Sequence, residues 1–233
     1  MSDLIKGLEQ LNISDAEKKA DILNKYMEGI LHWNEKVNLT AITDREEFVQ
    51  KHIIDSLLCV SSEEFQKTSS VIDVGTGGGF PGIPLAVAFP EKEFVLMDSL
   101  AKRLKIVDEL CGELGINNVT TLHGRAEELG RQKGYRDNFD LCVSRAVANM
   151  STLSEYCLPF VKAGGSFIAY KGPDCKSEIN DASRAIRVLG GKLLRIDKAG
   201  LDAYNHELVY ISKEISTPAA YPRKPGTPSR KPL

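Results

Sequence analysis

Apolar residues near the N-terminus recur at steps of three and four, the spacing of one face of an α-helix. One such face is formed by Ala16, Ala20, Leu23, Met27 and Ile30. A second face is formed by Phe48, Val49, Ile53, Leu57 and Leu58. The second follows residues 43–46, TDRE, whose order suits a capping box at a helix start. We therefore predict an N-terminal helical extension over residues 1–65.

From residue 71 onward, short apolar runs alternate with amphipathic stretches, which is typical of βαβ units around a mostly parallel sheet. Seven runs are predicted as strands: Val71–Val74, Glu93–Met97, Val119–His123, Phe139–Ser144, Ser166–Tyr170, Lys192–Ile196 and Glu207–Ser212. The interval between the last two is too short for a crossover helix, so we expect them to pair as an antiparallel hairpin. The pattern thus predicts an α/β domain over residues 66–215, Rossmann-like, with one antiparallel strand in a seven-stranded sheet.

The C-terminal segment, residues 216–233, has a different composition. Half of the chain's ten prolines fall at or after position 218, so a compact helix or strand is not expected there. The segment contains the cations Arg223, Lys224, Arg230 and Lys231, with no acid from residue 221 onward. We therefore predict a basic, proline-rich tail.

Composition narrows the class of protein further. With 42% hydrophobic and 27% charged residues, the chain can bury a full core, and its net charge of −2 neither favours nor excludes nucleic acid. The five cysteines form no CxxC pair, and the four histidines form no HxxxH pair, so neither a disulfide framework nor a metal site is predicted. Without an apolar run of membrane-spanning length or a signal peptide, we expect a cytoplasmic protein with no membrane association.

The strongest local motif is residues 71–82, VIDVGTGGGFPG, in which an apolar strand runs into a glycine-rich turn. Glycine is needed where the backbone turns sharply and a ligand approaches without a Cβ in its way. Gly77, Gly79 and Gly82 form the GxGxxG pattern of a nicotinamide dinucleotide site. Asp73, Gly75, Gly77 and Gly79 instead form the DxGxGxG pattern found in methyltransferases that use S-adenosylmethionine. A purely structural tight turn is the third interpretation.

The acid before the turn favours S-adenosylmethionine, because the methionine end of that cofactor carries an ammonium, whereas a pyrophosphate favours bare amides at a helix N-terminus. Asp73, Gly75 and Gly77 are therefore candidate cofactor-binding residues. Asp98, at the end of the second strand, suits either cofactor because both offer a ribose diol. Its structural alternative is an acid at the start of the following helix.

Further candidates follow the other strands, at the sheet edge where open α/β folds bind ligands. After the third strand, Ala126 and Glu127 offer an amide and an acid to an adenine amino group, unless the acid only favours a helix start. Arg145 follows the fourth strand and is either a cation beside cofactor and substrate or a surface ion pair. Lys171 follows the fifth and either contacts a phosphate or base or is solvated. The tetrad typical of exocyclic-amine methyltransferases is absent after the fourth strand, which disfavours amine targets.

Taken together, six segments resemble the RsmG (GidB) family of 16S rRNA guanine-N7 methyltransferases. They are Trp33-Asn34-x3-Asn38-Leu39-Thr40, His52-Ile-x-Asp55-Ser56-Leu57, Asp73 to Pro84, Asp98-Ser99, Ser144-Arg145-Ala146, and Pro222 to Pro228. The resemblance implies a class I S-adenosylmethionine-dependent methyltransferase with an N-terminal helical extension. It further implies that Gly75 and Phe80 line the cofactor, that Ala126 and Glu127 frame the adenine, and that Arg145 belongs to the same pocket.

The substrate implied by the resemblance is guanine 527 in the 530 loop of 16S rRNA, within the small ribosomal subunit. Guanine N7 carries a lone pair and no hydrogen, so its methylation needs alignment and no general base, and we predict no acid–base catalytic residue. Lys171, Arg223, Lys224 and Lys231 are the candidate RNA contacts, and a monomer is expected. Three other hypotheses stay open: a small-molecule methyltransferase, a nicotinamide-dependent oxidoreductase and an RNA-binding module without activity.

Overall fold

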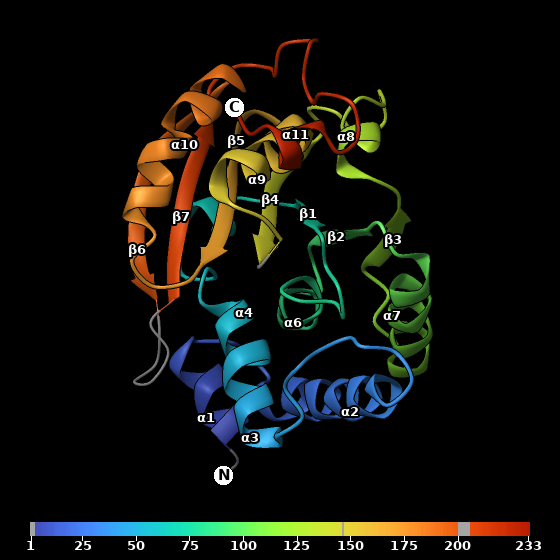
Figure 1. The fold of residues 1–233 in the computed structure, drawn as a ribbon. Helices are drawn as coiled ribbons and strands as arrows, with labels where there is room; N and C mark the ends of the chain where they lie inside the picture. The colour runs from blue at the N-terminus through green and yellow to red at the C-terminus, as the bar shows by residue number, and fades with distance from the viewer. Residues whose placement is uncertain (1–2, 146, 200–205) are drawn as a thin grey trace.

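The computed structural model describes residues 3–145, 147–199 and 206–233. Seven strands form one sheet in the order β3-β2-β1-β4-β5-β7-β6 (Figure 1). The strands are β1 (Ser70–Val74), β2 (Glu93–Asp98), β3 (Val119–His123), β4 (Phe139–Arg145), β5 (Val161–Lys171), β6 (Gly191–Ala199) and β7 (His206–Lys213). The predicted fold class and all seven predicted strands are thereby confirmed.

The strand register agrees with the predicted mixture of parallel and antiparallel pairs. β1 to β5 pair in parallel, whereas β7 pairs antiparallel with β6, as predicted, and also with β5. β5 begins earlier than predicted because Val161 already pairs with Phe139, ahead of a register shift in β4. Since Lys171 pairs with Glu207, the start of β7 lies beside the carboxyl end of β5.

Helices cover both faces of the sheet and enclose two hydrophobic cores. One face carries α1 (Asp3–Gln10), α2 (Ala16–Asn34), α3 (Arg45–Phe48), the π-helix η1 (Val49–Ile54), α4 (Asp55–Leu57), α5 (Glu63–Gln66), α6 (Gly82–Ala88) and α7 (Ala101–Leu114). The other carries α8 (Ala126–Leu129), α9 (Met150–Cys157), the 3-10 helix η2 (Leu158–Phe160), α10 (Lys176–Val188) and α11 (Thr227–Arg230). Within β1, Val71 packs on the first face and Ile72 on the second, as the two-residue period of a strand requires.

The N-terminal helices share the first of these cores with the sheet. The predicted face of α2 is buried through Ala20, Leu23, Met27 and Ile30. The second predicted helix begins at Arg45, one residue later than a capping box starting at Thr43 predicts. Its N-cap is Asp44, whose carboxylate accepts a hydrogen bond from the Glu47 backbone N–H. It continues through η1 into α4, so the predicted run from Phe48 to Leu57 is one helical segment with a π-helical centre.

The C-terminal tail is folded against the second face, and the expectation that it holds no helix is wrong. The short helix α11 follows Gly226, whose φ of +77° is in the left-handed region, and Pro228 lies in the first turn. Proline is tolerated at that place because the first N–H groups of a helix have no intrahelical partner. The Thr152 hydroxyl of α9 donates to the Pro228 carbonyl at 3.0 Å, which holds the tail on α9 (Figure 1).

Candidate cofactor pocket

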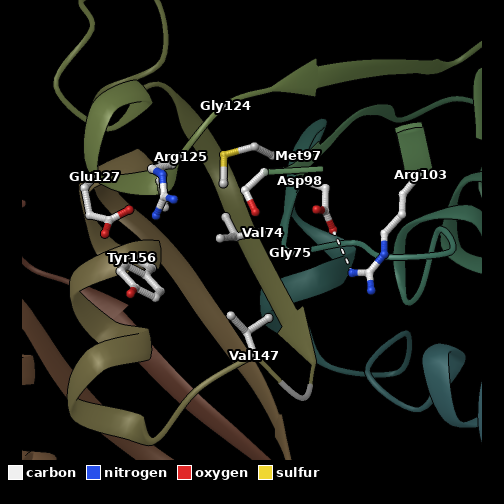
Figure 2. A pocket seen from close by; sticks show the side chains of 12 residues that line it. Val74, Gly75, Met97, Asp98, Arg103, Gly124, Arg125, Glu127, Val147 and Tyr156 are labelled. Carbon is white, nitrogen blue, oxygen red and sulfur yellow. Dashed lines mark ion pairs between the residues drawn. The ribbon is translucent and has the colours of Figure 1, made fainter. Parts of the chain in front are cut away.

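A cavity of about 320 Å³ opens at the carboxyl ends of β1, β2 and β3. The strand order reverses between β1 and β4, and open α/β sheets bind ligands at such a switch point. We call it the cofactor cavity, and its lining is Val74, Gly75, Met97, Asp98, Ser99, Arg103, Gly124, Arg125, Ala126, Glu127, Val147 and Tyr156. Figure 2 shows Asp98 and Arg103 on one side, with Glu127 and Tyr156 on the other.

The loop after β1 requires glycine for two physical reasons. Gly75 has a φ of +79°, and a Cβ there would lie 2.5 Å from the Val147 side chain. Gly79 has a φ of +89°, and a Cβ there would lie 2.4 Å from the Tyr26 hydroxyl. The Tyr26 hydroxyl donates to the Gly78 carbonyl at 2.9 Å, so this residue of α2 holds the loop in place. The glycine loop is therefore held in one conformation, and Gly75 presents backbone atoms without a side chain to the cavity.

Asp98 connects this loop to the end of β2. One carboxylate oxygen accepts from the Gly77 N–H at 3.0 Å, and the other accepts from the Leu100 N–H at 2.8 Å. Arg103 lies 3.8 Å from the same carboxylate (Figure 2). Asp98 thus lines the cavity, whereas Gly77 lies behind it with its amide already bonded to Asp98.

Asp73 lies beneath the loop and is fully buried. Its Oδ2 accepts from the Thr76 hydroxyl at 2.7 Å and from the Gly82 N–H at 2.9 Å. Burial raises the pKa of Asp73 to about 7. Within the described part of the chain, Asp73 Oδ1 is a buried oxygen with no hydrogen-bond partner. Asp73 does not line the cofactor cavity, and its contact with a cofactor ammonium stays a prediction.

The far wall of the cavity comes from α8 and α9. Ala126 and Glu127 both lie there, as predicted from their place after β3. The Glu127 carboxylate accepts from the Gly226 N–H at 2.9 Å, so the tail helps to hold it. Sequence reasoning missed Arg103, Arg125 and Tyr156. Arg125 directly precedes the predicted Ala126 and could have been found from its place after β3. Arg103 and Tyr156 lie within helices, and only the packing of α7 and α9 brings them to this edge.

Besides Asp73 and Gly77, two further residues expected in this pocket lie outside its lining. Arg145 lines a second cavity of about 320 Å³, at the carboxyl ends of β4 and β5. Its guanidinium donates to Asp55 Oδ2 at 2.7 Å and to the Lys51 carbonyl at 3.0 Å, which turns it toward the N-terminal helices. Phe80 does not line the cofactor cavity, because its ring is buried against His52, with ring centroids 4.7 Å apart in a stacked arrangement.

His52 was not predicted as a site residue, although it belongs to one of the segments that carried the resemblance. Burial and the Arg145 charge lower the pKa of His52 to about 4, so the ring is neutral near pH 7. Arg145 donates to Nδ1 at 3.1 Å, which leaves Nε2 as the protonated nitrogen, donating to the Thr40 hydroxyl oxygen at 2.6 Å. Both ring nitrogens are therefore engaged.

The four candidate RNA contacts have different surroundings. Lys171 lies in the second cavity with Arg145 and pairs with Glu178 at 2.6 Å. Arg223 forms a two-pronged ion pair with the fully buried Glu155, with the shorter contact at 2.6 Å. Lys224 and Lys231 are exposed. The tail therefore presents fewer available cations than its composition indicates.

Comparison with solved structures places the fold. An O-methyltransferase from Bacillus cereus, solved in complex with SAH, matches with a TM-score of 0.53 at 17% identity, covering 81% of this chain and 90% of that one. A putative O-methyltransferase from Klebsiella pneumoniae matches with a TM-score of 0.52 at 16% identity, covering 81% and 90%. The sheet order and these matches show a Rossmann-like fold of the kind found in these methyltransferases.

Sequence comparison is more specific. The family model described as GidB, rRNA small subunit methyltransferase G, matches residues 19–208. Ribosomal RNA small subunit methyltransferase G from Clostridium novyi is 48% identical over 227 residues, covering 97% of this chain and 93% of the relative. The namesake from Alkaliphilus metalliredigens is 48% identical over 229 residues, covering 97% and 96%. This chain belongs to the rRNA small subunit methyltransferase G family.

Family membership decides between the hypotheses left open by the glycine motif. It confirms a methyltransferase and excludes the nicotinamide-dependent oxidoreductase. Among the described residues, no cluster of potential metal ligands is found and no helix is long and apolar enough to cross a membrane.

Proposed function

We propose that this protein transfers a methyl group from S-adenosylmethionine to N7 of guanine 527 in the 530 loop of 16S rRNA. The observation that carries the proposal is the family match over residues 19–208, which includes the whole cofactor cavity. The relatives are named for methylation of small-subunit ribosomal RNA. The choice of N7 follows from the sequence resemblance and from the chemistry of the site.

The residues of the cofactor cavity suit binding of the methyl donor. Gly75 offers bare backbone, Asp98 offers a carboxylate to the ribose, and Ala126 with Glu127 offers an amide and an acid to the adenine. When bound, S-adenosylmethionine supplies an electrophilic methyl group on a positively charged sulfur. The protein's own work is to hold the acceptor base in line with that methyl group, which can contribute roughly 7–11 kcal/mol to lowering the barrier.

The side chains near Arg145 support a reaction that needs no general base. Guanine N7 has no hydrogen to remove. His52 is a poor base, because both of its ring nitrogens are engaged and its pKa is lowered to about 4. The Asp55 carboxylate holds the His206 ring, and this hydrogen bond raises the pKa of His206. These groups are suited to positioning a nucleophile that carries no proton.

We further infer that the small ribosomal subunit is the partner, that the protein acts as a monomer, and that it works in the cytoplasm, where ribosomal RNA is assembled. We also propose that the chain consists of an N-terminal helical extension (1–65), a methyltransferase domain (66–215) and a basic, proline-rich tail (216–233).

The direct test is transfer of labelled methyl from S-adenosylmethionine to 30S subunits from a strain that lacks this gene, followed by mapping of the modified base. We expect one methyl group per subunit, at N7 of guanine 527. Subunits from the parent strain are the control and should accept none. Incorporation at another atom or nucleotide would refute the assigned position. Absence of incorporation, with S-adenosylmethionine still bound, would favour a small-molecule methyltransferase.

A further inference from the structure

The C-terminal tail, residues 216–233, lies outside the residues matched by the family model, 19–208. It runs over the second face of the sheet beside α8 and α9, the two helices that form the far wall of the cofactor cavity (Figure 1). Tyr221 and Leu233 pack on the hydrophobic core of this face, and Pro222 and Pro228 are buried. The tail is therefore a folded part of the protein next to the cofactor cavity.

Two arginines that follow α8 hold the first half of the tail by its backbone. Arg131 donates to the Ala220 carbonyl at 2.9 Å. Arg136 donates to the Tyr221 carbonyl at 2.9 Å and, at the same distance, to the carbonyl of Gly130 just after α8. The path of the tail is thus fixed relative to α8.

Helix α9 holds the next part of the tail. The buried Glu155 carboxylate accepts from the Arg223 backbone N–H at 2.7 Å and from the Arg223 guanidinium at 2.6 Å. The Thr152 hydroxyl, three residues earlier in α9, donates to the Pro228 carbonyl at 3.0 Å. Arg223 and Pro228 lie on either side of Gly226 in the chain, so these contacts fix the position of Gly226.

Gly226 connects the tail to the cofactor cavity. Its backbone N–H donates to Glu127 Oε1 at 2.9 Å, and Glu127 lines the cavity although it is 4% exposed. Among the described residues, no other hydrogen-bond donor contacts this carboxylate. A nearly buried carboxylate requires hydrogen-bond donors. Because the tail engages Oε1, Oε2 remains for a donor that enters the cavity.

Tyr156 gives the tail a second contact with the same wall. Figure 2 shows Tyr156 beside Glu127. Burial and the nearby Glu127 charge raise the pKa of the Tyr156 hydroxyl, and a hydrogen bond with Ser229 of α11 partly offsets them. The tail therefore contacts both Glu127 and Tyr156.

We propose that the tail is a positioning element of the cofactor site, in which the Gly226 N–H holds the Glu127 carboxylate toward the adenine end of S-adenosylmethionine. This inference rests on the function proposed above, since it takes S-adenosylmethionine as the ligand of the cavity. The adenine amino group donates hydrogen bonds, and a charged acceptor binds such a donor more strongly than a neutral one. A glutamate side chain that is already ordered loses little further rotamer freedom when the cofactor binds. The tail thus contributes to cofactor affinity through Glu127.

Thr152 gives a test that leaves the lining of the cavity unchanged, because Thr152 is buried and does not line it. Thr152→Val keeps the shape of the side chain and removes the hydroxyl that holds the Pro228 carbonyl, whereas Thr152→Ser keeps the hydroxyl. Thr68→Val is the matched control, because the buried Thr68 hydroxyl also donates to a backbone carbonyl, that of Phe65, at 2.8 Å. Thr68 precedes β1, at the end of the sheet away from the cavity.

The measurement is the Kd of the full-length protein for S-adenosylmethionine by calorimetry, with denaturant unfolding to monitor the fold. We expect Thr152→Val to raise the Kd at least fivefold, and Thr152→Ser and Thr68→Val to stay within twofold of the wild type. Both valine variants lose one buried hydrogen bond, so a merely structural role would lower the stability of both and change the Kd of neither. In a Glu127→Ala background, Thr152→Val should change the Kd by less than twofold, because the side chain through which the tail acts is absent.

Gly226→Ala tests the same contact where Thr152→Val does not fold. An alanine at a φ of +77° is strained, and its Cβ would lie 3.8 Å from Arg230, so the strain falls on the backbone that carries the donor. Gly164→Ala is the control, because Gly164, near the start of β5, has a φ of +84° and its added Cβ would meet no atom within 4 Å. We expect Gly226→Ala to raise the Kd at least threefold and Gly164→Ala to leave it unchanged.

Three results separate the inference from the function on which it rests. A wild-type Kd in folded Thr152→Val, or in Gly226→Ala where Thr152→Val does not fold, would overturn the role of the tail. A further loss of affinity on adding Thr152→Val to Glu127→Ala would also overturn it, because the tail would then act by another route. A wild-type protein that binds no S-adenosylmethionine would instead refute the proposed function.

Discussion

The Arg145 guanidinium, at the end of β4, donates to Asp55 Oδ2 of α4 at 2.7 Å. The Asp55 side chain is 4% exposed and that of Arg145 is 11% exposed, so the pair is shielded from water. Asp55 also bonds to His206 at the start of β7. This one carboxylate therefore joins the N-terminal helices to two strands of the sheet.

Removing that carboxylate is expected to destabilise the fold. Asp55→Ala leaves the Arg145 charge buried without its partner, and loss of one member of a buried pair typically costs about 3–5 kcal/mol. Denaturant unfolding measures the difference. Asp21→Ala, which breaks an exposed pair with Lys25, is the control and should change stability by less than about 0.5 kcal/mol. Equal stability of the two variants would show that the Asp55 pair contributes little.

His52 is expected to make stability fall in mild acid. Burial lowers its pKa in the folded protein from 6.5 to about 4, so the unfolded chain takes up the proton first. The contribution of neutral His52 to the free energy of unfolding is fully present above pH 6.5. It is lost progressively as the pH falls toward 4. By linkage, the loss is about 2 kcal/mol by pH 5.

The measurement compares unfolding free energies at pH 7 and pH 5 for the wild type and His52→Gln. Gln cannot take up the proton, so the variant should lose about 2 kcal/mol less than the wild type over this interval, while other titrating groups cancel. His32→Gln, at an exposed position of α2, should behave as the wild type. A variant with the same pH dependence as the wild type would contradict the neutral, buried state of His52.

Asp98 is expected to control affinity for the methyl donor. Asp98→Asn keeps the shape of the side chain and removes the charge that faces the cofactor cavity beside Arg103. We expect the Kd for S-adenosylmethionine to rise at least tenfold, about 1.4 kcal/mol or more, by calorimetry. Glu128→Gln, at an exposed neighbour of the Glu127 site, should leave the Kd unchanged, and thermal unfolding monitors the fold of both variants.

The tail lysines are expected to contribute to RNA binding through phosphates. Lys224 and Lys231 are exposed, whereas Arg223 is tied to buried Glu155. If both lysines neutralise phosphates, Lys224→Ala with Lys231→Ala should reduce the slope of log K against log salt by about 1.4–1.8. An unchanged slope would exclude these contacts. Arg223→Ala should instead destabilise the fold, because it leaves the Glu155 carboxylate buried without its cation.

Local patterns were enough to predict the strands, the helix faces and the glycine loop. Apolar runs such as Val71–Val74 report strands because a central strand of a parallel sheet is buried on both faces. The need for glycine at position 75 is also local, since it follows from the turn that the backbone must make after β1. Asp98 could be placed beside that turn because the carboxyl ends of parallel strands meet at one edge of the sheet.

The division into two cavities and the state of the charged residues followed only from the tertiary structure. Arg145 pairs with Asp55, and Arg223 pairs with Glu155, although the members of each pair are far apart in the chain. The residues next to either arginine do not indicate which carboxylate it will contact. The tail's helix likewise depends on its contacts with α9. A side chain's role depends on which distant groups satisfy its hydrogen bonds and on how far burial removes water. The hydrogen-bond partners and the burial of a side chain are set by the packing of helices on the sheet. That packing cannot be inferred from a short stretch of sequence.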